Sequence, residues 1–201
     1  EREGEAAGIS LRRSEARFNA LAGRSTEIVS FSAADGTTLY RSPSATRLLG
    51  WTVEELAAQK PADLVVAEDR AHFAAELGRL ASGAQREIAF AYRLRHSDGS
   101  IRWFETSATN LLDDPDVGAI VGSHRDVTAQ KLAEIALQES RNLLEEAQAI
   151  AHVGSWVSSI DPPDGARFSR ECYRVYGMPE GSIVTAAAAI ECVHPDDRER
   201  V

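Results

Sequence analysis

The sequence predicts an α+β protein in which two short strands, several helices and three longer strands follow one another. Three observations predict this order: an alternating apolar pattern at residues 88–94, helical spacing of apolar residues within 43–82, and glycine-containing turns between the strand-like runs. The 201 residues are 43% hydrophobic and 26% charged, which is ordinary for a folded globular chain. This length accommodates one complete domain and part of another.

The N-terminal part predicts a helix followed by a β-hairpin. Residues 1–22 are rich in Ala, Glu and Arg, with apolar residues at roughly helical intervals. Residues 27–33 and 38–42 are short runs of β-forming residues, and Asp35-Gly36 between them suits a tight turn. Two antiparallel strands are therefore expected here.

Helical segments are expected from residue 43 to residue 82. Pro43 begins a short helix and Gly50 ends it, at the helix ends that these residue types favour. In the last helical segment, Phe73, Leu77 and Leu80 mark one face.

Three strands are expected next. The first is a half-buried antiparallel strand, because apolar residues alternate with polar or small ones; the apolar members are Ile88, Phe90, Tyr92 and Leu94. A turn at Ser97-Asp98-Gly99 leads to strands over 100–112 and 117–127.

A long helix is predicted over residues 128–151, which contain neither Pro nor Gly. Two apolar stripes compete on it, one through Leu137 and Leu144 and the other through Leu132 and Leu143. A coiled coil is expected, and the stripes leave its register open.

Part of the chain is repeated. SPSATRLLGW at 42–51 is echoed by SRECYRVYGM at 169–178, and VVAEDR at 65–70 by VHPDDR at 193–198. The second copy stops at Val201, before any counterpart of the strands at 87–127. We therefore expect the sequence to be a fragment of a longer protein.

Four segments together carry a family resemblance: SEARFNAL (14–21), ADGTTLYRSPSATRLLGWTVEEL (34–56), YRLRHSDGSIRWFE (92–105) and GSHRDVTAQKLAE (122–134). Their order and spacing resemble tandem bacterial PAS sensor domains closed by C-terminal PAC strands. The resemblance implies the PAS fold, a five-stranded antiparallel sheet with helices on one face. It divides the chain into an N-terminal dimerisation helix (1–22), a PAS domain with PAC strands (23–127), a signalling linker helix (128–151) and the N-terminal part of a second PAS domain (152–201).

Charge and composition argue against several partners. The formal net charge is −9 and no segment concentrates basic residues, so nucleic acid is not an expected partner. No apolar run is long enough for a membrane span, and the first ten residues do not resemble a signal peptide, so a cytoplasmic location is expected. Cys172 and Cys192 are expected to be buried thiols without a metal.

No catalytic site is expected. The chain lacks a kinase-type H-box, a GGDEF-like loop and a Walker A motif. His152, in AHVGSW, is interpreted as a residue at the start of the second domain.

Cofactor expectations follow from the resemblance. A cysteinyl-flavin adduct is excluded because residues 43–82 contain no cysteine. Haem needs an axial histidine on the helix before the central strands, and His72 lies there, eleven residues before Gly83, a spacing that resembles the rhizobial oxygen-sensing haem PAS domain. A domain without a cofactor is favoured over haem.

The space between sheet and helices is expected to hold either a small organic ligand or a solidly packed core. His96 and His124 are expected to be exposed at strand ends. The residues proposed to line this space are Ile28, Tyr40, Leu49, Trp51, Leu64, Phe73, Leu77, Ile88, Phe90 and Tyr92.

The strand-to-helix junction is the expected relay. Asp126-Val127-Thr128 resembles the family's D-[IV]-T motif, in which Asp126 or Thr128 caps the following helix. Lys131 stands where a capping box from Thr128 would place Glu.

The functional hypothesis is a sensory, signal-transmission and dimerisation module of a bacterial sensor histidine kinase in a two-component system. Its expected partners are a second copy, an output domain in the same chain and a small-molecule ligand. Three rival hypotheses are a haem-based gas or redox sensor using His72, an input module of a diguanylate cyclase or phosphodiesterase, and a dimerisation scaffold that senses nothing.

Overall fold

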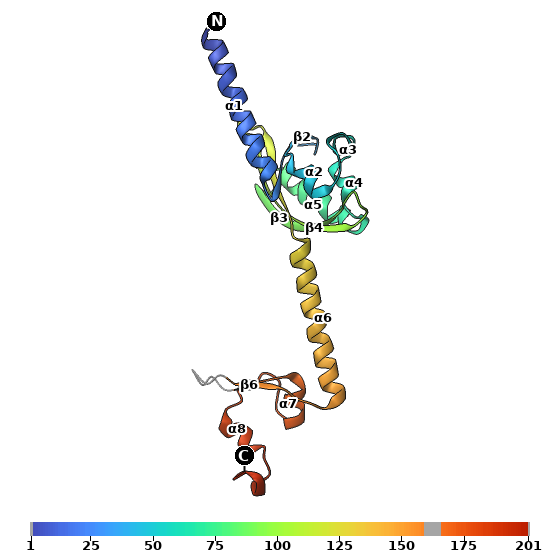
Figure 1. Ribbon diagram of the computed structural model, residues 1–201, viewed down its shortest axis with the longest axis vertical. Coiled ribbons are helices and arrows are strands. Elements are labelled where there is room, and N and C mark those ends of the chain that lie inside the picture. Colours follow the sequence, from blue (N-terminus) through green and yellow to red (C-terminus); the bar gives the residue numbers. More distant parts are fainter. Residues whose placement is uncertain (1, 159–165, 201) are drawn as a thin grey trace. The chain divides into compact units, whose positions relative to one another are not determined.

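The computed structural model describes residues 2–158 and 166–200 (Figure 1). The chain divides into two compact units, one up to Leu132 and one from Ala133 onward. Residues 159–165, which belong to the predicted second domain, lie outside the described part. No described helix is long and apolar enough to cross a membrane.

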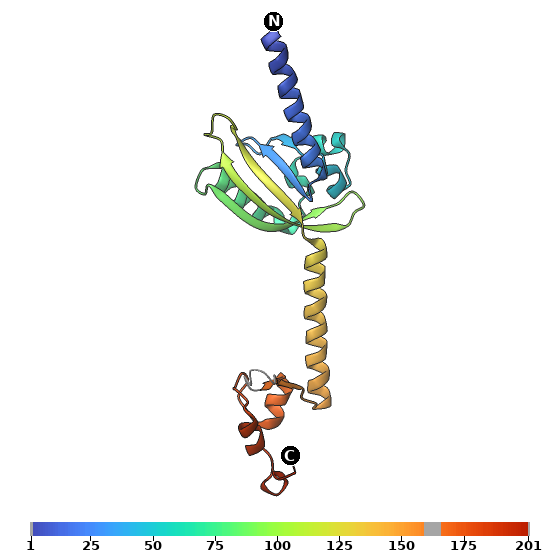
Figure 2. The same cartoon turned by 60° about the vertical axis from the view of Figure 1, so that its left-hand side comes forward.

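A five-stranded antiparallel sheet forms the first unit, as predicted. Its spatial order is β2-β1-β5-β4-β3, so the last strand in sequence lies at the centre (Figure 2). The strands are β1 (Glu27–Ser32), β2 (Thr38–Arg41), β3 (Glu87–Arg95), β4 (Ile101–Leu111) and β5 (Ala119–Asp126).

The helices between β2 and β3 cover one face of this sheet, which confirms the predicted layering (Figures 1 and 2). Buried strand residues such as Ile28, Tyr92 and Phe104 pack with Leu49 and Phe73 from the helices. The helical elements are α2 (Ser44–Leu49), α3 (Val53–Ala58), α4 (Pro61–Leu64), the 3-10 turn η1 (Ala67–Asp69) and α5 (Arg70–Ala81).

Two longer helices flank the domain. The N-terminal helix α1 (Arg2–Arg24) reaches the outer face of the sheet, where Phe18 contacts Tyr40 with ring centroids 5.6 Å apart and Asn19 Oδ1 accepts a 2.8 Å hydrogen bond from the Tyr40 hydroxyl. The linker helix α6 (Thr128–Ala151) directly follows β5 and has the predicted bounds.

The second unit repeats local features of the first. Strands β6 (Trp156–Ser158) and β7 (Ala166–Phe168) pair antiparallel, and α7 (Arg170–Tyr176) ends at Gly177 with φ of 67°, as α2 ends at Gly50 with φ of 73°. Helix α8 (Ala186–Glu191) and the 3-10 turn η2 (Pro195–Asp197) follow. Local sequence similarity is thus accompanied by the same helix-glycine geometry.

The cysteine prediction is half wrong. Cys172 is buried in α7, but Cys192 is exposed because it lies at the C-terminal end of the short helix α8.

The end of α2 docks closely on the β3–β4 turn. Gly50 adopts a left-handed conformation, and the backbone N–H of Ser97 donates to the carbonyl of Leu49 at 3.0 Å. A Cβ atom on Gly50 would lie 2.2 Å from Ser97 Oγ and 2.6 Å from His96 Cε1. Position 50 therefore favours glycine for its backbone angle, and a Cβ atom there would also have to displace the side chains of Ser97 and His96.

Replacing Gly50 should cost more than replacing a glycine with the same backbone strain in open space. Gly99 has φ of +84°, and a Cβ atom on it would meet nothing within 4 Å, so Gly99→Ala measures the conformational penalty alone. We expect Gly50→Ala to lower the free energy of unfolding by about 1–3 kcal/mol more than Gly99→Ala, since crowding adds to strain. Urea unfolding of both variants measures this difference, and equal losses would show that the turn accommodates the methyl group.

Candidate functional site

A cavity of about 550 Å³ lies between the sheet and the helices of the first unit. Exposed Asp35, Lys60 and Ala62 are among its lining residues, so it opens to solvent between the β1–β2 turn and the start of α4. Ligand pockets in proteins commonly have volumes of about 300–1,000 Å³. The space is therefore large enough for a small organic molecule.

Six of the ten residues proposed to line this space lie in the cavity wall. Phe73 and Tyr92 form an aromatic corner, with ring centroids 4.8 Å apart. The six are Ile28, Leu49, Leu64, Phe73, Leu77 and Tyr92.

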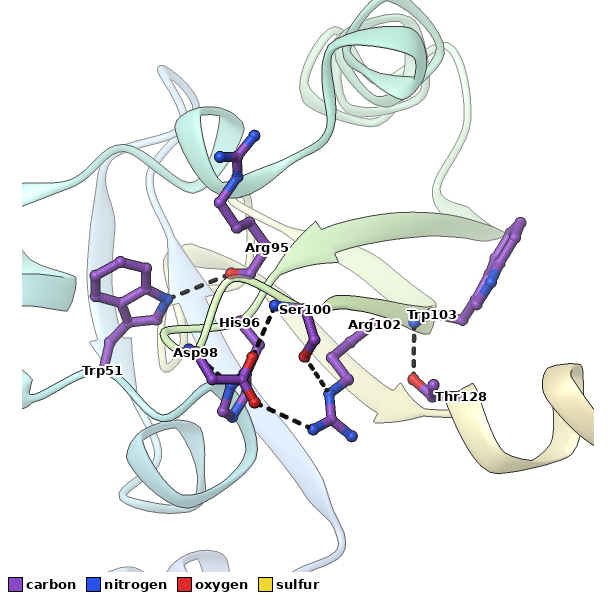
Figure 3. A network of polar contacts seen from close by, with 8 residues as sticks. All are labelled: Trp51, Arg95, His96, Asp98, Ser100, Arg102, Trp103 and Thr128. Carbon is purple, nitrogen blue, oxygen red and sulfur yellow. Dashed lines mark hydrogen bonds and ion pairs between the residues drawn. The ribbon is translucent and has the colours of Figure 1, made fainter.

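The other four proposed residues lie elsewhere. Tyr40 alternates onto the outer face of β2, where it contacts α1. Trp51 follows α2, and its indole N–H donates to the carbonyl of Arg95 at 3.3 Å (Figure 3). Ile88 packs with Leu80 in a second buried cluster, and Phe90 packs at the edge of both clusters.

A polar cluster occupies the sheet side of the cavity. His124 Nε2 lies 2.9 Å from Ser30 Oγ, and His124 Nδ1 lies 2.6 Å from Thr106 Oγ1 and 3.2 Å from the Tyr92 hydroxyl oxygen. The Thr106 hydroxyl also donates to Tyr92 at 3.1 Å. Side chains from β1, β3 and β4 thus contact the imidazole of His124, which lies on β5.

The imidazole of His124 is held neutral. Burial lowers the pKa of His124 to about 4, and the nearby positive charge of Arg41 acts in the same direction. Burial raises the pKa of Tyr92 to about 12, so its hydroxyl stays protonated. The cluster therefore offers neutral hydrogen-bonding groups to the cavity.

The sequence-based expectation for His124 was wrong. β5 continues in register to Asp126, so His124 lies within the strand and, like Ile120 and Gly122, faces the cavity. The alternation of residues 120, 122 and 124 was the available signal. Gly122 gives the ring its space, since a Cβ there would lie 3.0 Å from both His124 Nε2 and Ser30 Oγ. His96 is also not fully exposed, with 17% of its side-chain surface accessible.

Arg41 places a positive charge in the cavity. It pairs with Ser30 across β2 and β1, and both side chains line the cavity. Burial lowers the pKa of the Arg41 guanidinium. Arg41 was not among the proposed site residues because its orientation depends on the strand pairing.

The residues do not fit a haem site. His72 is exposed over 56% of its side chain, lies 3.8 Å from Glu76 and is outside the cavity lining. His124 does face the cavity, but both of its ring nitrogens already contact hydroxyl groups. An axial ligand from either histidine would require rearrangement of the site.

The junction to α6 is tied to the sheet by three hydrogen bonds. The Thr128 hydroxyl oxygen accepts from the backbone N–H of Trp103 at 2.9 Å (Figure 3), and the Trp103 carbonyl accepts from Val127 N–H at 2.9 Å. Asp126 Oδ1 accepts from Thr128 N–H at 2.9 Å. Both predicted relay residues, Asp126 and Thr128, therefore form hydrogen bonds at the strand-to-helix junction.

β4 is anchored on both sides of the junction contact. At its start, Asp98 accepts from the backbone N–H of Ser100 at 2.7 Å and lies 3.8 Å from Arg102 (Figure 3). The hydrogen bonds from Ser100 lower the pKa of Asp98 to about 2. On the neighbouring strand, Arg93 lies 5.4 Å from the Trp103 ring centroid and forms a forked ion pair with Asp69.

The low pKa of His124 predicts a specific loss of stability in acid. In the unfolded chain its pKa is about 6.5, so between about pH 6.5 and 4 the unfolded state binds the extra proton. His124 should contribute a decline in the free energy of unfolding of up to about 1.4 kcal/mol per pH unit across this window. Urea unfolding should show a shallower decline in His124→Gln, while His72→Gln should retain the wild-type decline. Equal slopes in wild type and His124→Gln would contradict the assignment.

Comparisons with known proteins agree with this architecture. A family model described as PAS fold matches residues 38–124. A sensory box histidine kinase/response regulator from Burkholderia thailandensis E264 is 24% identical, with a TM-score of 0.50 over 65% of this chain and 98% of that structure.

Two further solved structures are similar. One is the PAS domain of a protein from Colwellia psychrerythraea, at 20% identity and a TM-score of 0.48 over 60% of this chain and 98% of that one. The other is a domain of a sensory box sensor histidine kinase/response regulator from Geobacter sulfurreducens, at 25% identity and a TM-score of 0.47 over 58% and 96% of the two chains. A search of curated proteins gave no match.

The matched segment begins at β2 and ends within β5, and so spans all the helices that enclose the cavity. Together with the strand order and the likeness to the Burkholderia structure, this match shows that the five-stranded domain of this chain has the PAS fold.

Proposed function

We propose that this chain is a ligand-binding sensory and relay module of a bacterial signalling protein, most directly a sensor histidine kinase. The observation that carries the proposal is a cavity whose wall includes β5, the strand that continues into α6. The names of the similar Burkholderia and Geobacter structures support the kinase context. No catalytic role is assigned to the chain itself.

The relay follows the pairing of β4 and β5. His124 lies opposite Thr106 in the cavity wall, and two residues further Asp126 lies opposite Phe104. The next contact along this ladder is Thr128 on Trp103. A ligand that shifts the His124–Thr106 pair therefore shifts strands whose ends hold the first turn of α6, which is a short mechanical path from cavity to helix.

Helix α6 also supplies the proposed dimer contact. It carries large apolar side chains that are more than half exposed, including Leu132, Leu137 and Leu144. Two such helices from two copies would bury these side chains in a coiled coil and connect the module to an output domain.

Residues 152–201 are proposed to be the N-terminal part of a second PAS domain. The support is the repeated order of a strand pair, a short helix ended by a left-handed glycine, and a later 3-10 turn. Within this unit, the largely buried Glu171 of α7 is paired with Arg174 at 2.5 Å and with His152 at 3.3 Å.

A substitution that fills the cavity should change the hydrogen exchange of amides at the start of α6. Ala108 is buried and lines the cavity, so Ala108→Leu adds bulk there, while Ala91→Leu on the exposed outer face is the matched control. We expect Ala108→Leu to change hydrogen exchange of the amides in the first turn of α6 by about threefold or more, and Ala91→Leu to leave it unchanged.

The junction contacts should be required for this response. In a Thr128→Val background, which removes the hydroxyl contact to Trp103, the effect of Ala108→Leu on α6 should shrink. Unchanged exchange in Ala108→Leu, with the same fold by circular dichroism, would favour the scaffold that senses nothing. A signalling readout in the complete protein would separate a kinase from a cyclase or phosphodiesterase.

A further inference from the structure

Among the residues that the structure describes, the cavity wall contains a cation, Arg41, with no anionic partner. Arg41 forms no ion pair with a carboxylate among the described residues. Its guanidinium donates two long hydrogen bonds, 3.5 Å to the Leu56 carbonyl oxygen and 3.4 Å to Thr38 Oγ1. Removing a guanidinium from bulk water without a paired anion is costly. The half-buried Arg41 therefore has capacity to bind an anion in the cavity.

The other charged groups of the lining do not neutralise Arg41. Lys60 is a second cation at the exposed mouth, and Asp35 there is already held by the backbone N–H of Thr37 at 2.8 Å. The remaining titratable groups, His124 and Tyr92, are neutral near pH 7. Of the described residues that line it, the interior of the cavity thus presents one positive charge and no negative one.

Most of the rest of the wall is apolar. Opposite the sheet, the helices contribute Leu64, Phe73 and Leu77, and the sheet adds Ile28, Phe104 and Ala108. Such walls favour a hydrocarbon body over a second charged group. A single guanidinium with neutral hydroxyl groups nearby also suits a carboxylate, which it can bind through two parallel hydrogen bonds, better than a phosphate dianion.

We infer that the cavity binds a small organic monocarboxylate, with its carboxylate on the Arg41 guanidinium beside Ser30 and its apolar body against Phe73 and Leu77. This inference rests on the proposed ligand-binding function and specifies the chemistry of the ligand. Cationic ligands are disfavoured by Arg41, and neutral ligands leave its charge without a counterion.

Paired acids and amides test the charge requirement directly. Octanoate and 4-phenylbutyrate have apolar bodies suited to the cavity, and octanamide and 4-phenylbutyramide match their shapes without the charge. Calorimetric titration of the whole 201-residue chain should show each acid binding at least tenfold more tightly than its amide. Binding of acid and amide with equal affinity would overturn the inference while leaving a ligand-binding cavity in place.

Arginine variants test whether Arg41 supplies the charge that binds the acid. Arg41→Met should weaken acid binding at least tenfold and abolish the preference for acid over amide, whereas Arg95→Met, an exposed arginine on β3 outside the cavity lining, should leave both unchanged. Arg41→Lys retains the charge and should keep the preference for acids. This variant distinguishes loss of the charge from a general effect of substitution at position 41. Unchanged acid binding in Arg41→Met would refute the assignment.

Two further outcomes bear on the inference, and the second also bears on the proposed function. Ala108→Leu narrows the cavity and should weaken acid binding, so unaffected binding in that variant would place the acid site elsewhere and overturn the inference. Failure of the wild-type chain to bind any of the four compounds would count against the inference and against ligand binding by the cavity.

Discussion

The register of β5 between β1 and β4 is the constraint on which the rest of the domain depends. Because successive side chains point to opposite faces, this register turns Ile120, Gly122 and His124 toward the helices. A shift by one residue would exchange them for Val121, Ser123 and Arg125 and place a charged side chain against the core. One pairing pattern therefore determines the cavity wall and the point where α6 begins.

The polar groups of the cavity fall into two kinds with different energetic consequences. His124, Tyr92 and Thr106 contact one another and remain neutral, so they can be buried at small cost. Arg41 is charged, and its nearest acceptors are distant. The charge of Arg41 and the neutrality of His124 reinforce each other, because a proton on the imidazole would add a second positive charge to the same space.

Local patterns in the sequence predicted the elements, and long-range pairing decided the site. Alternating residues, the turns at Asp35-Gly36 and Ser97-Asp98-Gly99, and the Pro-free and Gly-free run of α6 are local signals, and the strands and helices followed them. The face of the sheet on which Tyr40, Arg41 and His124 lie depends on how their strands pair with neighbouring strands. Tyr40 was therefore assigned to the cavity although it faces α1, and the two inward polar residues were missed.

The junction combines a firm attachment with a helix surface that is free to pack. Thr128 is 9% exposed and holds Trp103, while Leu132, only four residues later, is 58% exposed. The attached end is held to the ends of β4 and β5, and in the proposed coiled coil the exposed stripes would decide which face of α6 meets another helix. In the proposed coiled coil, the two stripes on α6 are offset around its axis, so rotation of the first turn would favour one stripe over the other at the interface. In the proposed dimer, a displacement of the ends of β4 and β5 would therefore become a change in helix pairing.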